Sequence, residues 1–176
     1  VMFQSGYQAN TGLIQTIAEA GTPVYLDQMA HASLYQGVLA AGADLRPFRH
    51  NDIDHLQRQV TAFGPGVIAI DSVYSTDGSL APIQSVLTVA EKMGCALVVD
   101  ESHSLGTHGP RGSGLVVEMG LENRVHFRTA SLAKAFCGRA GLVACSSNFA
   151  HYLRFSSFPS IFSSAILPHE LAAFAK

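Results

Sequence analysis

The chain has 176 residues, of which 13 are acidic and 11 basic, giving a formal net charge of −2 with neutral histidines. This near balance argues against a nucleic-acid surface or a polybasic membrane patch, and no apolar run reaches the roughly 20 residues that a membrane helix needs. Charged residues make up 14% against roughly 25% in ordinary soluble domains, and hydrophobic residues 48%, so we expect a piece of a larger, oligomeric protein.

The first 20 residues contain no Lys or Arg and therefore lack the positive region of a signal peptide. Cys95, Cys137 and Cys145 show no C-x-x-C spacing. We expect them to be buried free thiols in a reducing compartment rather than a disulfide or zinc framework. These features predict a cytoplasmic protein.

Short strands alternate with helices along the sequence. A helical pattern follows Ser5-Gly6, and Asn51-Asp52 supplies a cap for a later helix. Strands are predicted at 22–26, 44–48, 66–70, 95–99, 125–129 and 141–145, and helices at 31–41, 53–63 and 82–93, with a largely helical tail from 149 that is interrupted at Pro159 and Pro168.

The strands at 66–70 and 95–99 are apolar on both faces. Such strands, alternating with helices, predict an α/β fold in which a mostly parallel sheet has helices on both faces. Its ligand should lie beyond the carboxyl ends of the strands. The polar residues expected there are Asp71, Ser75, Asp100, Glu101, His103, Ser131 and Lys134.

Two of these residues could carry chemistry. Asp100 directly follows an apolar strand, where it could be a turn or helix cap, or could pair with a cation such as a protonated pyridinium nitrogen. Lys134 is the only charged residue between 129 and 138, so we expect it to be partly buried. A buried lysine has a lowered pKa, and its neutral amine is a nucleophile of the Schiff-base type.

Two further elements are weaker by themselves. Ser5-Gly6 precedes a helical pattern, and this pair is either an ordinary helix cap or a helix start whose N–H groups bind a phosphate. His31 follows a strand, where its ring could stack on a planar ligand or be a structural histidine.

Together these elements resemble the α-oxoamine synthase family of fold-type-I pyridoxal-phosphate enzymes. That family includes 2-amino-3-ketobutyrate ligase, 8-amino-7-oxononanoate synthase, 5-aminolevulinate synthase and serine palmitoyltransferase. The matching segments run in order through the chain at 5–10, 31–33, 71–78, 100–106 and 131–135. Within the family, the runs 100–110 and 125–134 most resemble the bacterial quorum-sensing autoinducer synthases. Ala30 and Ala133 stand where the family commonly has Asn and Gly.

The resemblance implies pyridoxal 5′-phosphate as the cofactor and four catalytic residues. Lys134 would form the Schiff base with the cofactor and move the substrate α-proton. Asp100 would pair with the pyridine nitrogen and His31 would stack on the ring. His103 would lie near the phenolic oxygen and help to polarise the acyl carbonyl.

The remaining cofactor contacts implied by the resemblance concern the phenolic oxygen and the phosphate. Ser75 would lie near the phenolic oxygen. The phosphate would be held by Gly6, Tyr7 and Ser131, and by Ser163 or Ser164 of a neighbouring subunit.

The implied activity is the condensation of an acyl-CoA with an amino-acid-type substrate to give an aminoketone, a precursor of α-hydroxyketone signals. The implied assembly is a homodimer with shared active sites. Residues 1–176 would be the cofactor-binding large domain, with an N-terminal segment and a C-terminal small domain outside this chain.

Three other interpretations remain open. An aminotransferase or lyase of the same fold type would share Asp100 and Lys134. A metal site could use His103 and His108 with the neighbouring acids, although their spacing is not i, i+4 and glycines lie between them, so no metal is expected. An inactive fragment that binds cofactor or a partner is the third.

Overall fold

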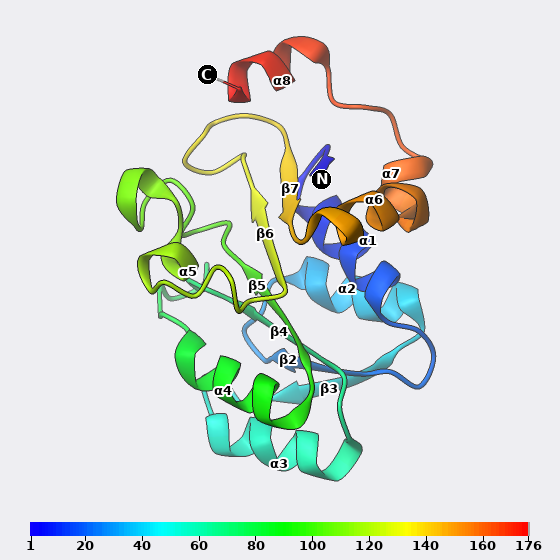
Figure 1. Ribbon diagram of the computed structural model, residues 1–176, viewed down its shortest axis with the longest axis vertical. Coiled ribbons are helices and arrows are strands. Elements are labelled where there is room, and N and C mark those ends of the chain that lie inside the picture. The colour runs from blue at the N-terminus through cyan, green and yellow to red at the C-terminus, as the bar shows by residue number, and fades with distance from the viewer. Residues whose placement is uncertain (176) are drawn as a thin grey trace.

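A seven-stranded sheet forms the centre of the computed structural model, which describes residues 1–175 (Figure 1). The strand order is β1-β7-β6-β5-β4-β2-β3, with β2 to β6 parallel and β7 antiparallel to both β6 and β1. The strands are β1 Met2–Phe3, β2 Pro23–Asp27, β3 Asp44–Phe48, β4 Val67–Asp71, β5 Ala96–Asp100, β6 Phe127–Ser131 and β7 Gly141–Ala144. The predicted α/β class and mostly parallel sheet are confirmed.

The helices begin and end at residues that the sequence marks. Ser5, Asp52 and Ser146 are side-chain N-caps, and Gly42 ends a helix at φ 65°, a left-handed conformation that glycine adopts without strain. The helices are α1 Gly6–Ile17, α2 Ala32–Ala41, α3 Ile53–Phe63, α4 Ile83–Met93, α5 Leu115–Glu118, α6 Ser147–Ser156, α7 Phe158–Ile161 and α8 Pro168–Phe174, with a 3₁₀ turn at Pro110–Gly112. Among these described helices, none is both long and apolar enough to cross a membrane.

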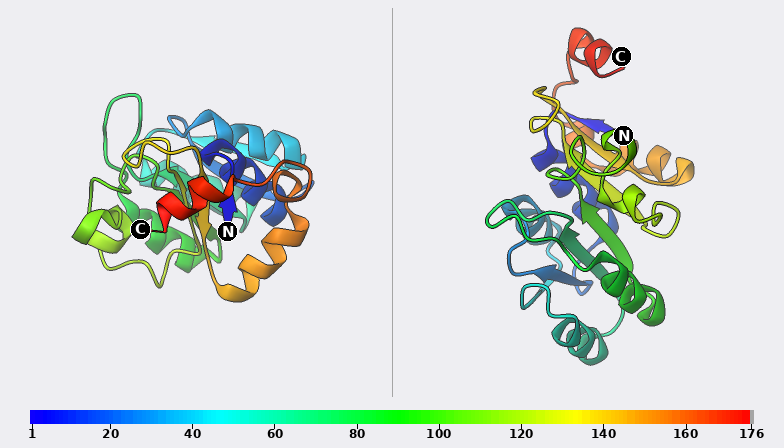
Figure 2. Two further views of the ribbon diagram at one scale, coloured as in Figure 1. Left: turned by 90° about the horizontal axis from the view of Figure 1, so that it is seen from above. Right: turned by 90° about the vertical axis from the view of Figure 1, so that its left-hand side faces the viewer.

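The sheet is packed on both faces, which explains why its central strands β4 and β5 are apolar up to their last residues, Asp71 and Asp100. In β4, Ile68 and Ile70 belong to the core beneath α3 and α4, whereas Val67 and Ala69 belong to the core beneath α1 and α2. Figure 2 shows the two helical layers on opposite sides of the sheet. A strand in this position has no solvent face, so its residues before the carboxyl end are apolar on both faces.

Some predicted boundaries were wrong. β6 runs two residues later than expected, because the buried Val125 that suggested a strand packs into the core from the preceding turn. The helical tail is interrupted just before Pro159 and Pro168, as expected, and the two prolines lie in the first turns of α7 and α8. Proline has no N–H to lose at a helix start, so these positions favour it.

The three cysteines are free, but only one is fully buried. Cys95 is buried and Cys145 half-buried, whereas Cys137 is exposed on the loop after β6. The prediction of burial is therefore wrong for Cys137, whose side chain points to solvent although Phe174 of α8 lies against the neighbouring Gly138.

The glycine-rich loop after β5 is fastened to the sheet by a buried ion pair. Glu101 is 1% exposed, and its carboxylate accepts hydrogen bonds from the Val116 backbone N–H and from the Arg128 guanidinium at 2.9 and 2.5 Å. Arg128 also donates to the Ser113 carbonyl at 2.8 Å. Glu101 is thus a structural anchor and does not face the ligand end of the sheet as the sequence suggested.

We predict that Arg128→Met lowers the free energy of unfolding by about 3–5 kcal/mol, because it leaves the buried Glu101 charge without its partner. Urea unfolding measures this loss. The matched control is Arg124→Met, which breaks an ion pair with Glu91 whose side chains are 43% and 44% exposed, and should cost at most about 1 kcal/mol. Equal losses in the two variants would contradict the anchoring role.

Candidate active site

A cavity of about 200 Å³ lies at the carboxyl ends of β4, β5 and β6, beside the start of α1. Its position agrees with the ligand site expected of a mostly parallel sheet. Its lining residues are Ser5, Gly6, Tyr7, Asn10, His31, Asp71, Asp100, Ser102, His103, Ser131 and Lys134.

A larger cavity of about 580 Å³ lies near the opposite end of β6. Its cationic groups are already occupied, since Arg124 pairs with Glu91 and Arg128 with Glu101. His126 likewise accepts a hydrogen bond from the Leu97 backbone through Nδ1. We therefore place the candidate active site in the smaller cavity, where polar groups converge.

The start of α1 forms one wall of the candidate active site. The Ser5 hydroxyl caps the helix by accepting from the Gln8 N–H at 3.1 Å, whereas the Gly6 and Tyr7 N–H groups lie in the first turn and have no intrahelical partner. A Cβ added to Gly6 would lie 2.6 Å from the Ser131 Cβ, so only glycine lets the helix start approach the end of β6. Free N–H groups at the start of this 12-residue helix suit an anion.

Two buried carboxyl groups, Asp71 and Asp100, lie side by side on β4 and β5. Asp100 accepts two hydrogen bonds, from the Asn10 side-chain amide at 2.6 Å and from the Ser102 backbone N–H at 2.8 Å. Asp71 receives one long bond, from the His31 backbone N–H at 3.3 Å. Burial, and then the neighbouring Asp100, raise the pKa of Asp71 to about 8. The pair therefore combines a neutral acid with a carboxylate held by two donors.

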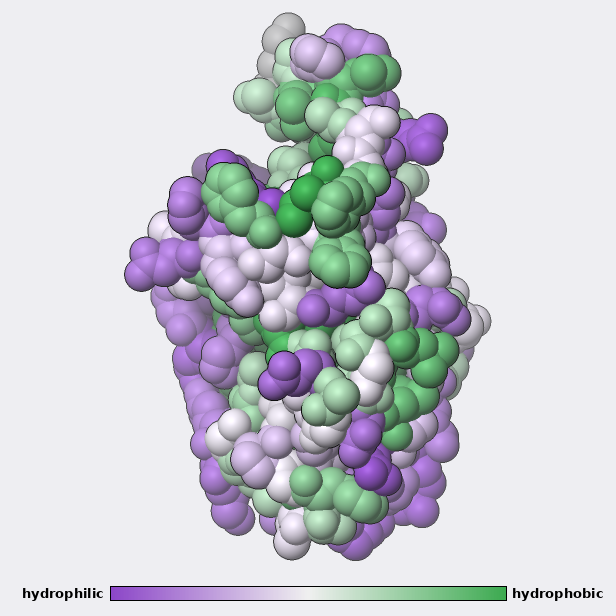
Figure 3. Space-filling view, turned by 90° about the vertical axis from the view of Figure 1, so that its right-hand side faces the viewer, coloured by the Kyte–Doolittle hydropathy of each residue, from purple (hydrophilic) through white to green (hydrophobic). Residues whose placement is uncertain are grey.

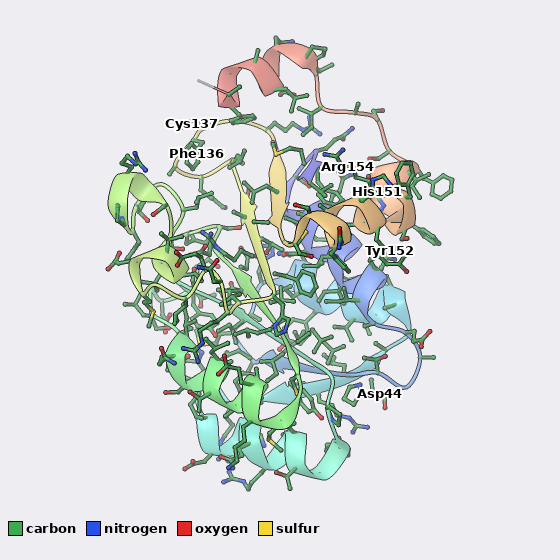
Figure 4. The ribbon with its side chains drawn as sticks, viewed as in Figure 1. Asp44, Phe136, Cys137, His151, Tyr152 and Arg154 are labelled. Atoms are coloured by element: carbon green, nitrogen blue, oxygen red, sulfur yellow. The ribbon has the colours of Figure 1, made fainter. Side chains whose placement is uncertain are left out.

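His103 and Lys134 complete the polar side of the cavity. Burial lowers the pKa of His103, and the Lys134 charge lowers it further, so the ring is neutral at pH 7. Lys134 is exposed, which makes the predicted partial burial wrong. The reason is that the loop after β6 projects beyond the sheet, and Figure 4 labels Phe136 and Cys137 on this loop.

Two residues expected to contact a cofactor do not line this cavity. Ser75 is exposed in the turn after β4. The Ser163 hydroxyl donates to the Pro159 carbonyl at 2.5 Å and borders a different cavity, which includes Met2 and Phe3. The other predicted cofactor contacts do line this cavity together, namely Gly6, Tyr7, His31, Asp100, His103, Ser131 and Lys134.

Sequence reasoning missed Asn10 as a residue of the site. It lies four residues after Gly6 on α1, one helical turn away and therefore on the same face. This four-residue spacing from Gly6 was the sequence signal that could have placed Asn10 in the site. Polarity by itself gave none, because a helical asparagine is usually solvent-exposed.

No metal site is apparent in the part of the chain that the structure describes, since it contains no suitable group of three His, Cys, Asp or Glu side chains. The His108 Nδ1 contacts the adjacent Thr107 hydroxyl at 3.0 Å, and Glu101 is occupied by Arg128. Neither residue joins His103 in a common site.

Comparisons with known proteins agree with this geometry. The family model for aminotransferase class I and II matches residues 1–176. Over 176 residues the chain is 52% identical to the CAI-1 autoinducer synthase of Vibrio campbellii, covering 100% of this chain and 45% of that protein. It is 38% identical to a putative 8-amino-7-oxononanoate synthase of Halalkalibacterium halodurans, covering 98% of this chain and 44% of the relative.

Among solved structures, a serine palmitoyltransferase variant from S. paucimobilis with a bound PLP-myriocin aldimine superposes with a TM-score of 0.94 at 32% identity. The match covers 98% of this chain and 44% of the other. The chain thus spans less than half the length of these relatives. The resemblance to α-oxoamine synthases is confirmed by the relatives found.

We predict that Asp71→Asn changes how stability depends on pH in the protein without added cofactor. Because the pKa of Asp71 rises from 3.8 to about 8 on folding, the folded state keeps a proton that the unfolded chain releases, and stability falls as pH rises through this window. The amide does not titrate. Urea unfolding should therefore show that the free energy of unfolding of the variant rises relative to that of the wild type between pH 5 and pH 8.

The control for this experiment is Asp77→Asn. Hydrogen bonds from the Ser79 backbone and hydroxyl lower the pKa of the exposed Asp77, so its charge adds stability at neutral pH instead of removing it. This variant should show no gain as pH rises. Parallel curves for Asp71→Asn and the wild type would contradict a raised pKa at Asp71.

Proposed function

Because the chain belongs to the aminotransferase class I and II family, we propose that it is the cofactor-binding large domain of a pyridoxal-phosphate-dependent acyltransferase. One observation carries the proposal. A single cavity brings together a helix start suited to an anion, a buried carboxylate and a lysine amine, at Gly6, Asp100 and Lys134. An N-terminal segment and a C-terminal small domain would account for the remaining length of the relatives.

The residues of the cavity fit pyridoxal phosphate. Gly6 leaves room at the start of α1, where its N–H and that of Tyr7, with the Ser131 hydroxyl, would hold the phosphate. Asp100 supplies a negative charge for the protonated ring nitrogen, and Lys134 supplies the amine that binds the aldehyde.

When bound, pyridoxal phosphate supplies an electron sink for negative charge at the substrate α-carbon. Asp100 would keep the ring nitrogen protonated, and its two N–H donors fix the orientation of the carboxylate. Lys134 would move the α-proton. His103 is neutral because of its lowered pKa, so it would donate one N–H to the acyl carbonyl oxygen without adding a positive charge beside Lys134. His31 would cover one face of the ring.

The substrates we propose are an acyl-CoA and an amino-acid-type compound, joined to give an aminoketone with release of CoA. The relatives support an acyl transfer over an aminotransfer, since they include an autoinducer synthase, a serine palmitoyltransferase and a 5-aminolevulinate synthase. Identity of 52% to the CAI-1 autoinducer synthase supports a quorum-sensing signal precursor as the product. The free thiols support a cytoplasmic location.

We also propose a homodimer that shares its active sites. Aromatic side chains gather on α6, on α7 and directly after α7, with Phe155 71%, Phe158 63% and Phe162 78% exposed. Figure 3 shows apolar surface on the side of the molecule that carries these helices, and Figure 4 shows Tyr152 on the outer side of α6. Apolar surface of this kind is typical of a protein interface.

We predict that Lys134→Ala in the full-length protein abolishes two signals together. Borohydride reduction after addition of pyridoxal phosphate should place a pyridoxyl group on Lys134 in the wild type, detected by peptide mapping, and none in the variant. Release of CoA thiol from an acyl-CoA should need both the amino substrate and Lys134.

The control is Lys92→Ala, at the end of α4 and outside the cavity, which should keep both signals. A pyridoxyl group on Lys92 would refute the assignment of Lys134. Labelling at Lys134 with an amino-group transfer to a keto acid, and no CoA release, would show that the enzyme is an aminotransferase.

We predict that the full-length protein sediments as a homodimer and that Ser163→Ala with Ser164→Ala weakens cofactor binding. Loss of each hydroxyl donor should cost on the order of 1 kcal/mol, or more if the acceptor is the charged phosphate. Spectroscopic titration with pyridoxal phosphate measures the change, with Ser156→Ala on α6 as the control. A monomer that retains bound cofactor would contradict the shared site.

A further inference from the structure

We propose that Asn10 and Ser33 form a relay from Asp100 that places the ring proton of His31 on Nε2. The importance of this relay for catalysis rests on the proposed function, but its hydrogen bonds do not. The relay consists of Asp100 of β5, Asn10 of α1, Ser33 of α2 and His31, the residue that caps α2. Asn10 and Ser33 are positioning residues in this scheme.

The first step is that Asp100 fixes the side-chain amide of Asn10. Both oxygens of a carboxylate accept hydrogen bonds, so the Asn10 atom 2.6 Å from the Asp100 Oδ2 must be the amide nitrogen. The Asn10 Oδ1 is buried and has no hydrogen-bond partner among residues 1–175. Rotating the amide would turn that oxygen towards the carboxylate, so the amide keeps one orientation.

The second step passes from Asn10 to Ser33. The Asn10 amide nitrogen also lies 2.9 Å from the Ser33 hydroxyl oxygen, to which it donates its second N–H. Ser33 is fully buried, and its hydroxyl oxygen lies 2.7 Å from the His31 Nδ1. Because Asn10 can only donate in this arrangement, the Ser33 proton is left to be donated to Nδ1.

The third step sets the tautomer of His31. Its Nδ1 faces the Ser33 hydroxyl at 2.7 Å and the Ser33 backbone N–H at 3.3 Å, and both are donors. If Nδ1 carried the proton, the buried Ser33 hydroxyl proton would lose its acceptor, since no other is present among residues 1–175. The ring proton must then be on Nε2.

The consequence is a single N–H donor on a ring that lines the candidate active site. The charged and titratable groups that share this cavity with His31 are Asp71, Asp100, His103 and Lys134. The relay would link the group that we propose covers the cofactor ring to the group that we propose pairs with its nitrogen. The Asn10 oxygen has no hydrogen-bond partner because the orientation that lets the amide nitrogen donate to both Asp100 and Ser33 turns the oxygen away from them.

The experiment is two-dimensional proton–nitrogen NMR of the full-length protein with ¹⁵N-labelled histidine, first without cofactor. His31→Gln identifies the His31 signals by their disappearance. The wild type should show the pattern of an Nε2-protonated neutral ring. Ser33→Ala and Asn10→Ala should each convert it to a mixture of tautomers, whereas Ser33→Thr, which retains the hydroxyl, should preserve it.

The matched control is Ser79→Ala, which removes the hydroxyl 2.9 Å from the Nε2 of a different histidine, His50, and should leave the His31 signals unchanged. An Nδ1-protonated or doubly protonated His31 in the wild type at pH 8 would overturn the relay, even if the variants fail to fold. An unchanged tautomer in folded Ser33→Ala would overturn it as well.

Cofactor binding is measured separately, from the absorbance of added pyridoxal phosphate. Binding combined with a wild-type Nδ1 proton would overturn the relay and leave the proposed function standing. No binding, combined with a tautomer that depends on Ser33, would overturn the proposed function and support the relay.

Discussion

The buried carboxylate of Asp100 is the constraint on which this site depends. It lies at the end of a central strand, where a charge is costly unless hydrogen-bond donors surround it. The Ser102 backbone supplies one donor, and Asn10 of α1 supplies the other. Because Asn10 must reach Asp100, α1 has to start close to the end of β6, and that approach requires glycine at position 6.

Three neighbouring acidic residues, Asp71, Asp100 and Glu101, are buried, and each is stabilised in a different way. Asp100 is held by N–H donors, Glu101 pairs with Arg128, and Asp71 stays protonated because burial and the adjacent Asp100 raise its pKa to about 8. Each solution has its own use. The charge of Asp100 faces the cavity, the Glu101 pair fastens the glycine-rich loop that follows it, and the neutral Asp71 avoids a second negative charge beside Asp100.

The chain has few charged residues, and its surface accordingly exposes several large apolar side chains. Most exposed aromatic side chains lie in α6, α7 and the loop after β6, and Phe136 on that loop is 48% exposed. The same loop carries Lys134, which is also exposed. A second subunit or a further domain over that loop would cover Phe136 and enclose the lysine together, which would fit a chain that spans 45% of a relative's length.

Local sequence patterns determined much of this protein. Asp52 and Gly42 mark helix ends, and the apolar run of β4 indicates a strand buried on two faces. The position of the site also follows from the sequence, because the carboxyl ends of parallel strands meet at one edge of the sheet and Lys134 follows one of these strands. Only the tertiary structure decided which acid faces the cavity. Glu101 and Asp100 are adjacent, but successive residues at the end of a strand point to opposite sides. The Asn10 contact joins residues 90 positions apart, and such a pairing is fixed by packing, which no local pattern contains.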